Sequence, residues 1–348
     1  MSSTAGVFTY EEIMSQGEIW KKTITSSAVQ VESIREWISY PREEVIFAGC
    51  GSTYYLSLSA AKTWTILTGE SARGVPSSEI WYYPYATFSK LKPSLVAVSR
   101  SGETTETINS FKVFREKYNE EGLVISCYPN SVMAQSSKLT LLAPDAHETS
   151  IAQTRSFSSM YILSQILAAT VANNDGFIRE LTRLPDVFSR IIPKNEDLVK
   201  EIGCDLKYQH IVFLGSGVFY GLACETMLKM KEMSTSISEV FNFMEIRHGP
   251  MSVISDKSLV IGLISDTRKK EELKVLTDMK ALGATTLALV EDATDVNADF
   301  TIELQSGISE VARGAAYLPL LQLMGYYHSI QKGLNPDKPT SLNTVVYL

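Results

Sequence analysis

A short polar segment, SRSGET at residues 99–104, follows the apolar run LVAV and precedes a helical pattern. The carboxyl end of a parallel strand is where ligands bind in open α/β sheets. Hydroxyls and backbone N–H groups at a helix N-terminus suit an anion, above all a phosphate. The alternative is ordinary helix capping, which SGET also fits. The corresponding segment of the second half, LISDTRKK at 263–270, has lost the serine pattern, and this asymmetry favours a ligand site in the first half.

A second polar cluster is Glu225, Lys229 and Glu232, spaced i, i+4 and i+7 within ETMLKMKE. This spacing places the three side chains on one face of a helix. A carboxylate with a lysine one turn away can move a proton and stabilise the resulting oxyanion. The alternative is a solvated, salt-bridged face. Against it, the helix starts at a glycine turn, so its first turns are expected to border a cleft.

The glycine turn belongs to a pattern that occurs twice. Residues 45–56, VIFAGCGSTYYL, align without a gap with residues 211–222, IVFLGSGVFYGL. Each copy predicts a buried strand, a tight turn and the start of a helix, as expected of a duplicated unit. Gly51 lets the backbone approach a ligand, and Ser52 and Thr53 could add hydroxyls to the same pocket. The alternative is a plain strand–helix turn.

The third candidate is His248 in EIRHGP, one of four histidines in the chain. The Gly-Pro turn after it predicts a loop position that a ligand can reach, although a lone loop histidine is commonly inert. The sequence contains no HExxH motif and no Cys/His cluster, so we expect no metal. The glycine turns lack the third glycine of a dinucleotide fingerprint, which disfavours a nicotinamide enzyme, and we expect no cofactor.

The elements that must position these residues alternate between strands and helices, which implies parallel sheets covered on both faces. Strands are predicted at 45–49, 94–99, 123–127, 139–143, 210–214, 258–264, 285–290 and 299–303. Helices are predicted at 9–39, 53–68, 104–118, 218–234, 268–282 and 307–332, and a long Ser/Thr-rich start runs into an apolar helix within 149–173. A helical linker is predicted at 175–205, interrupted at Pro185 and Pro193.

We therefore expect an α/β fold of two tandem doubly wound parallel-sheet domains. The predicted parts are N-terminal helices at 1–40, a first domain with the phosphate site at 41–195, a second domain with the catalytic helix and the histidine loop at 196–334, and a tail at 335–348.

Composition narrows the functional classes. The 348 residues are 45% hydrophobic and 20% charged, which indicates a globular chain. A net charge of −7 argues against a nucleic-acid surface. No apolar run approaches the ~20 residues of a membrane span, and the N-terminus shows no secretory signal. Four cysteines without CxxC spacing indicate reduced thiols, and we expect a cytoplasmic protein.

Taken together, these motifs resemble the sugar isomerase (SIS) family. The layout is similar to the isomerase half of glucosamine-6-phosphate synthase and to stand-alone glucosamine- or galactosamine-6-phosphate deaminase/isomerases. The likeness extends from EEIMSQGEIWKKTI near the start to NPDKPTSLNTVVYL at the end, and its specific motifs are SRSGETTET, ETMLKMKE and EIRHGP.

The resemblance implies a role for each matching residue. Ser99, Ser101 and Thr104 would bind the phosphate, with Arg100, Gly51, Ser52 and Thr53 beside them. Gln153 in IAQTRSF would contact the sugar. Glu232 would move a proton between C1 and C2, with Glu225 and Lys229 on its helix face and Lys229 near the sugar oxygens. His248 would open the sugar ring, supplied by the neighbouring subunit of a homodimer.

Two departures from the synthase shape the expected function. The chain starts where the isomerase half would, so no glutamine-hydrolysing domain is expected, and Thr344 stands where the synthase carries a Schiff-base lysine. We expect an aldose–ketose isomerase/deaminase that converts a 6-phosphorylated amino sugar into fructose 6-phosphate and ammonia. The alternatives are hydrolysis of a fructosamine 6-phosphate, plain isomerisation, and a non-catalytic phosphosugar sensor.

Overall fold

The two copies of the duplicated pattern form equivalent strands, β1 (Glu44–Gly49) and β6 (His210–Leu214), each at the second position of a five-stranded parallel sheet. The computed structural model describes residues 5–340 and 342–343. The strand orders are β2-β1-β3-β4-β5 and, written from the equivalent edge, β7-β6-β8-β9-β10. Two tandem doubly wound parallel sheets are therefore confirmed.

The chain divides into two compact units. The first-sheet unit comprises mainly residues 15–148 and 155–185. Its elements are α2 (Gln16–Ser27), η1 (Ala28–Gln30), α3 (Val31–Ser39), β1, α4 (Ser52–Thr68), β2 (Ala72–Pro76), α5 (Ser77–Tyr82), α6 (Pro84–Thr87), β3 (Pro93–Val98), α7 (Thr105–Tyr118), β4 (Leu123–Ser126), α8 (Val132–Ser136), β5 (Thr140–Leu142), η2 (Pro144–Ala146), α9 (Arg155–Val171) and α10 (Asp175–Leu181).

The second-sheet unit comprises the N-terminal helix, residues 149–154 and Asp186–Leu342. Its elements are α1 (Val7–Met14), most of α11 (Leu184–Cys204), β6, α12 (Phe219–Ser234), β7 (Ser238–Phe241), η3 (Glu245–Arg247), η4 (Pro250–Val253), β8 (Ser258–Leu263), α13 (Lys269–Ala281), β9 (Thr285–Val290), β10 (Phe300–Glu303) and α14 (Gly314–Gln331). The domain limits predicted from sequence remain a prediction, because the units interleave along the chain.

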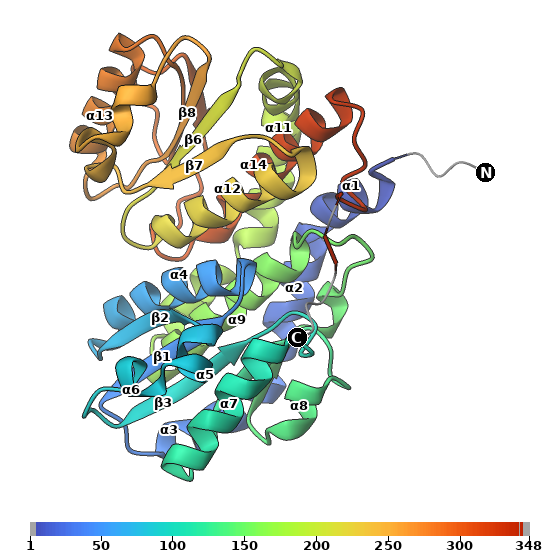
Figure 1. Ribbon diagram of the computed structural model, residues 1–348, viewed down its shortest axis with the longest axis vertical. Helices are drawn as coiled ribbons and strands as arrows, with labels where there is room; N and C mark the ends of the chain where they lie inside the picture. The colour runs from blue at the N-terminus through green and yellow to red at the C-terminus, as the bar shows by residue number, and fades with distance from the viewer. Residues whose placement is uncertain (1–4, 341, 344–348) are drawn as a thin grey trace. The chain divides into compact units, whose positions relative to one another are not determined.

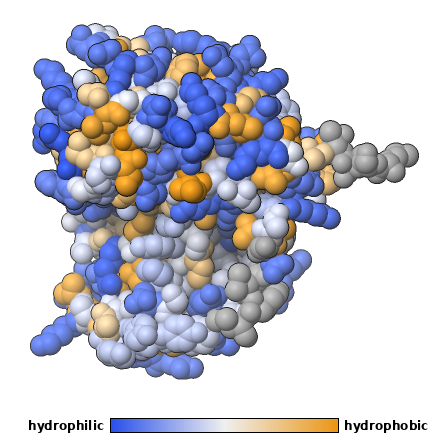
Figure 2. Space-filling model, turned by 45° about the horizontal axis from the view of Figure 1, so that its top comes forward, coloured by the Kyte–Doolittle hydropathy of each residue, from blue (hydrophilic) through white to orange (hydrophobic). Residues whose placement is uncertain are grey.

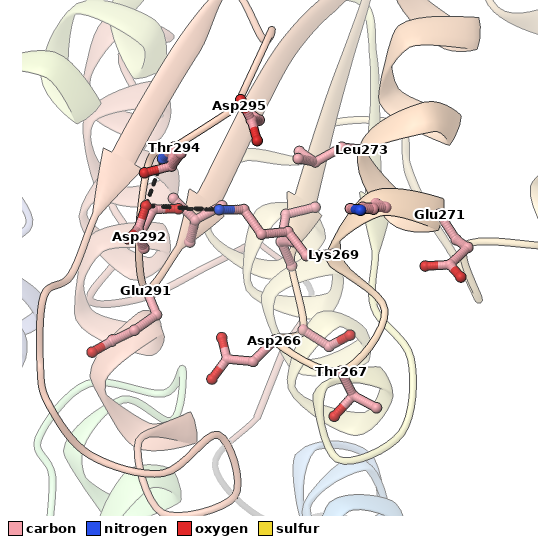
Figure 3. A pocket seen from close by; sticks show the side chains of 13 residues that line it. Asp266, Thr267, Lys269, Glu271, Leu273, Glu291, Asp292, Thr294 and Asp295 are labelled. Atoms are coloured by element: carbon pink, nitrogen blue, oxygen red, sulfur yellow. Dashed lines mark hydrogen bonds and ion pairs between the residues drawn. The ribbon is translucent and has the colours of Figure 1, made fainter.

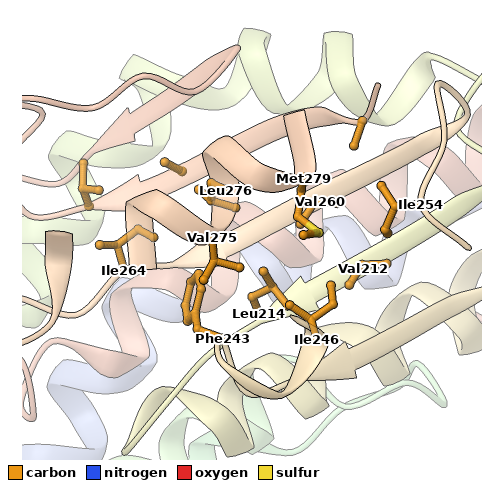
Figure 4. Packing of buried hydrophobic residues seen from close by; sticks show 13 residues of the cluster. Val212, Leu214, Phe243, Ile246, Ile254, Val260, Ile264, Val275, Leu276 and Met279 are labelled. Atoms are coloured by element: carbon orange, nitrogen blue, oxygen red, sulfur yellow. The ribbon is translucent and has the colours of Figure 1, made fainter. Parts of the chain in front are cut away.

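Helices cover both faces of each sheet (Figure 1). In the first-sheet unit α4 packs against α9 and α5 packs against α7, and in the second-sheet unit α12 packs against α14. The core beneath α13 is built from apolar side chains of β6, β8, β9 and α13 (Figure 4), among them Val212, Val260 and Leu276. The face drawn in Figure 2 mixes hydrophilic with scattered apolar side chains, as most folded protein surfaces do.

The eight predicted strands are confirmed, but two strands were missed. Both β2 and β7 lie at sheet edges, and most of their residues are only partly buried. Edge strands bury less apolar surface, so sequences such as ARGVP contain no apolar run from which a strand could be predicted.

Two helix predictions were wrong in detail. The segment 9–39 is not one helix but α1, α2, η1 and α3. The predicted interruption at Pro193 is absent, because α11 continues through it. A proline inside a helix removes one backbone hydrogen bond, and packing of the apolar face of α11, including Val199 and Ile202, outweighs that loss.

A buried carboxyl near the start of α13 predicts a pH-dependent stability. Burial raises the pKa of Glu272 from its ordinary value of 4.5 to about 7, although hydrogen bonds from Ser265 oppose the shift. The folded state therefore holds this proton more tightly than the unfolded chain does. Raising the pH from 5 to 8 should cost the wild type about 2 to 3 kcal/mol of unfolding free energy through this group.

Glu272→Gln should remove that pH-dependent cost. Chemical denaturation of both proteins at pH 5 and pH 8 measures it, and the variant should gain stability relative to the wild type as the pH rises. An equal difference at both pH values would contradict the prediction.

Candidate functional site

The SRSGET loop (residues 99–104) connects β3 to α7, so it lies at the carboxyl edge of the first sheet, beside the turn after β1. Sheet order reverses between these two strands, which is where open α/β sheets bind ligands. The Ser99 hydroxyl accepts the Gly102 N–H at 3.0 Å and lies 3.4 Å from the Thr104 hydroxyl. The Ser101 hydroxyl accepts the Glu103 N–H at 3.2 Å. The predicted serines and threonine are thus brought together in one tight turn.

Gly102 is required by this turn. Its φ is +65°, and a Cβ built there would lie 2.1 Å from the Ser131 hydroxyl, which caps α8. The Met133 N–H donates to the Gly102 carbonyl at 3.0 Å, so the loop is held against the start of α8. Only glycine fits both the backbone angle and this close approach.

The side chain of Arg100 forms an ion pair with a buried carboxylate. Its Nη1 lies 3.4 Å from Glu148 Oε2, and the side chains are 5% and 0% exposed. Glu148 was missed from the sequence. The signal was available, since it is an acidic residue just ahead of the long helix α9, where the positive end of the helix dipole attracts a carboxylate.

The turn after β1 brings Gly51, Ser52 and Thr53 to the same edge of the sheet. Gly51 adopts φ +54° and leaves open space where a side chain would stand. The Thr53 hydroxyl accepts the Cys50 N–H at 2.9 Å and donates to the Cys50 carbonyl at 3.0 Å. Thr53 therefore closes the turn through its hydroxyl, while Ser52 begins helix α4 beside it.

The predicted face of α12 is buried, not solvated. Lys229 is 1% exposed, with its Nζ 3.3 Å from Glu225 Oε1 and in direct contact with Glu232 Oε2. The Glu225 side chain is 0% exposed and that of Glu232 is 21% exposed. Glu232 is thus the member of the cluster that solvent or a ligand can reach.

The charge of Lys229 is maintained by its neighbours. Burial by itself lowers the pKa of this ammonium, but the carboxylates of Glu225 and Glu232 more than offset it, and the net pKa is raised above 10.5. A buried ammonium between two carboxylates is a fixed positive charge next to a partly exposed acid. Such a group can stabilise negative charge that develops on an oxygen during a reaction.

His248 lies on the turn between η3 and η4 and is exposed, as predicted. Gly249 after it has φ +123° and open space around it. Within this chain the described residues of the second-sheet unit leave the imidazole accessible.

Gln153 lies in the segment 149–154, which packs in the second-sheet unit. Its Oε1 is shielded from solvent and has no hydrogen-bond partner among the described residues. A buried amide oxygen without a donor is costly unless a ligand supplies one. Thr344, the remaining position singled out from the sequence, lies outside the described residues.

The equivalent loop of the second sheet is built differently. Beside it, at the carboxyl ends of β8 and β9, lies a cavity of about 670 Å³ (Figure 3). The Ser265 N–H donates to Glu272 at 2.6 Å, and the Asp266 and Thr267 N–H groups donate to Glu310 at 2.7 and 3.2 Å. Carboxylates of the chain itself take up the N–H groups that an anion would need, in line with the asymmetry predicted from sequence.

Further structural features of the chain concern its cysteines, its possible metal ligands and the hydrophobicity of its helices. All four cysteines are free thiols. Within residues 5–340 and 342–343, no group of three His, Cys, Asp or Glu side chains is arranged to hold a metal ion. None of the described helices combines the length and apolar character needed to cross a membrane.

Curated proteins that are similar to this chain include two aminotransferases. A glutamine–fructose-6-phosphate aminotransferase (isomerizing) of Sulfurisphaera tokodaii is 30% identical over 345 residues, which is 97% of this chain and 56% of that protein. The one of Pyrobaculum aerophilum is 27% identical over 349 residues, 97% of this chain and 57% of that protein. The chain thus spans just over half the length of these curated relatives.

Solved structures match over nearly the full length of both chains. The glucosamine-6-phosphate deaminase of Thermotoga maritima is 27% identical with a TM-score of 0.79, covering 97% of this chain and 99% of that one. The tagatose-6-phosphate ketose/aldose isomerase of Escherichia coli, at 22% identity, shares the fold with a TM-score of 0.88 and 98% coverage of both chains.

The family model described as the SIS domain matches twice, at residues 40–170 and 206–327. The two matches contain the two parallel sheets, the SRSGET loop, the buried face of α12 and His248. The chain therefore belongs to the SIS domain family, as its sequence motifs indicated.

Proposed function

We propose that this protein is a phosphosugar isomerase/deaminase, which converts a 6-phosphorylated amino sugar of the glucosamine 6-phosphate type into fructose 6-phosphate and ammonia. The observation that carries this proposal is the buried Glu225–Lys229–Glu232 cluster on α12, with one reachable carboxylate beside a fixed ammonium. Support comes from the deaminase of Thermotoga maritima, whose chain is matched from end to end.

The SRSGET loop is the proposed anchor for the phosphate. Its hydroxyls and its backbone at the start of α7 suit a dianion. Ser52 and Gly51 flank it on the neighbouring turn, and Thr53 shapes that turn. Gln153 is the proposed contact to the sugar, because its buried amide oxygen awaits a donor and a sugar hydroxyl is one.

The proposed chemistry starts from the open-chain aldose. Glu232 takes the proton from C2, and the electron pair forms the C1–C2 double bond of an enaminol. Lys229 stabilises the negative charge on the C1 oxygen, and Glu232 returns its proton to C1. The C1 oxygen gains a proton and the nitrogen loses one, which leaves a C1 hydroxyl and a double bond between C2 and nitrogen. Water then hydrolyses this imine to the C2 ketone and ammonia.

His248 is proposed to open the sugar ring by moving a proton between the ring oxygen and the C1 hydroxyl. An imidazole offers one donor and one acceptor nitrogen, which suits it to such a shuttle. We propose that it acts in the site of a second copy of the chain, in a homodimer.

A second candidate is the same isomerase chemistry run toward the amino sugar. It is favoured by the 30% identity to an aminotransferase of Sulfurisphaera tokodaii. Fructose 6-phosphate with ammonia would then be the substrates, and equilibrium measurements from both sides distinguish the directions.

A substrate panel tests the proposal. Glucosamine, galactosamine and fructosamine 6-phosphates should be offered, with ammonia and ketose release both measured. Ammonia is expected from glucosamine 6-phosphate, and Glu232→Gln should lower kcat by about 10²- to 10⁴-fold, because it removes a positioned general base. Lys231→Ala, an exposed neighbour on the same helix, is the matched control and should retain full activity.

Other results of the panel would change the assignment. An unchanged rate in Glu232→Gln would remove that carboxylate from the mechanism. Exchange between aldose and ketose without ammonia would identify a plain isomerase. Tight binding of every phosphosugar without turnover would favour the sensor.

The shared site makes a prediction of its own. If His248 serves the partner's Glu232, mixing inactive Glu232→Gln and His248→Asn chains should restore about a quarter of wild-type activity, since half of the C2 dimers would be mixed and hold one intact site. The measurement is activity after co-refolding or subunit exchange, beside each variant alone. No recovery, with mixed dimers verified by tagged chains, would show that each chain supplies its own histidine.

A further inference from the structure

The SRSGET loop contains a positive charge that is paired with a buried carboxylate. We propose that Arg100 and Glu148 form a positioning ion pair that fixes the shape of the loop, and that Arg100 does not touch the phosphate. This inference rests on the proposed function, since it takes the loop as the phosphate anchor.

The pair is buried at both ends. Arg100 Nη1 lies 3.4 Å from Glu148 Oε2, and the side chains are 5% and 0% exposed. Breaking a buried ion pair by removing one partner leaves an uncompensated charge, which is strongly unfavourable. The ion pair with Glu148 therefore fixes the position of the Arg100 side chain in addition to the geometry of its own loop.

Glu148 is anchored in turn on the first turn of α9. Its Oε1 accepts the Ser156 N–H at 3.1 Å, and its Oε2 accepts the Ser156 hydroxyl. A carboxylate that accepts a backbone N–H at a helix N-terminus is stabilised in its charged form. The chain of contacts runs from a fixed helix end through Glu148 to Arg100.

The backbone of Arg100 is held as well. Its carbonyl accepts the Cys127 N–H and the Ser126 hydroxyl, each at 3.2 Å, from the end of β4. The residue between the two loop serines is thus fixed by its main chain and by its side chain. The positions of the neighbouring hydroxyls, those of Ser99 and Ser101, therefore depend on the position of Arg100.

The second-sheet unit contains a comparable device with the charges reversed. Asp266, in the loop after β8, accepts hydrogen bonds from both terminal nitrogens of Arg313, at 2.7 and 2.6 Å. Arg313 is fully buried and immediately precedes α14, as Glu148 lies ahead of α9. In both units an ion pair connects the loop after the third strand to the segment ahead of the first α-helix that follows the last strand.

This recurrence argues for a structural role of the pair. The loop of the second sheet has its N–H groups occupied by Glu272 and Glu310, so it is not open to a phosphate. The Asp266–Arg313 ion pair at the corresponding place in the second-sheet unit therefore stabilises the loop and does not bind a ligand. With its charge neutralised by Glu148, Arg100 leaves recognition of the phosphate to hydroxyls and N–H groups.

The experiment compares Arg100→Gln and Glu148→Gln with the wild type. Inorganic phosphate is titrated by calorimetry, and KM and kcat are measured with glucosamine 6-phosphate. Both variants should weaken phosphate binding and raise KM by about tenfold or more, in parallel, because each removes the same charge-assisted contact, while kcat should change by less than about threefold. The double variant should be no worse than the weaker single one, as expected of coupled residues.

Asp266→Asn is the matched control. It weakens the corresponding pair of the second-sheet unit, so it should lower the melting temperature yet leave the phosphate affinity and KM unchanged. A parallel loss of phosphate affinity in this control would overturn the inference, because the effect would then reflect general destabilisation.

A direct contact between Arg100 and phosphate would give a different pattern. Arg100→Gln would lose affinity, whereas Glu148→Gln would keep or improve it, since it frees the guanidinium; this outcome overturns the inference. If the glutamine variants do not fold, Arg100→Lys and Glu148→Asp keep the charges and should both raise KM, and a rise in the lysine variant alone overturns it too.

The phosphate titration separates this inference from the proposed function. Wild-type protein that binds phosphate but releases no ammonia or ketose would refute the reaction and leave the parallel loss of affinity as a valid test. Wild-type protein that does not bind phosphate at all would overturn both.

Discussion

The buried ammonium of Lys229 is the interaction on which the proposed chemistry depends. Burial opposes its charge, and two carboxylates from the same helix restore it. Removing Lys229 instead would leave the buried Glu225 carboxylate without the ammonium that neutralises it. The helix is therefore committed to a fixed electrostatic arrangement before any substrate binds, which is the condition for stabilising a developing charge without reorganisation.

The topology explains why this helix and the SRSGET loop carry the polar residues. Each follows a strand of its own parallel sheet, at the carboxyl edge of that sheet. Loops at this edge can differ in sequence while the strands remain buried. The duplicated units have used this freedom differently. The first keeps hydroxyls after its third strand. In the second, Glu272 and Glu310 from outside the corresponding loop accept its N–H groups, and Asp266 within the loop pairs with Arg313.

An ion pair lies at the corresponding loop of both units: Arg100 and Glu148 are both buried, whereas Arg313 is buried and Asp266 is half-exposed. A buried charge is costly unless it is paired and hydrogen-bonded. Glu148 meets that requirement through Ser156, and Arg313 meets it through both carboxylate oxygens of Asp266. Such pairs favour one loop conformation over nearby alternatives, because any shift separates a charge from its partner. A loop that must place several hydroxyls around one anion gains from that restriction.

The sequence by itself determined the fold class, the family and eight of the ten strands found among the described residues. Buried parallel strands are continuous apolar runs, and the spacing of Glu225, Lys229 and Glu232 fixes a common helix face whatever surrounds it. Edge strands such as β2 were not predicted, because a partly buried strand needs no continuous apolar run in its sequence. Only the tertiary structure decided that the α12 face is buried, that Arg100 pairs with Glu148, and that Thr53 closes its own turn. These outcomes depend on residues that are distant in the chain or on the direction of a side chain, and local periodicity contains neither.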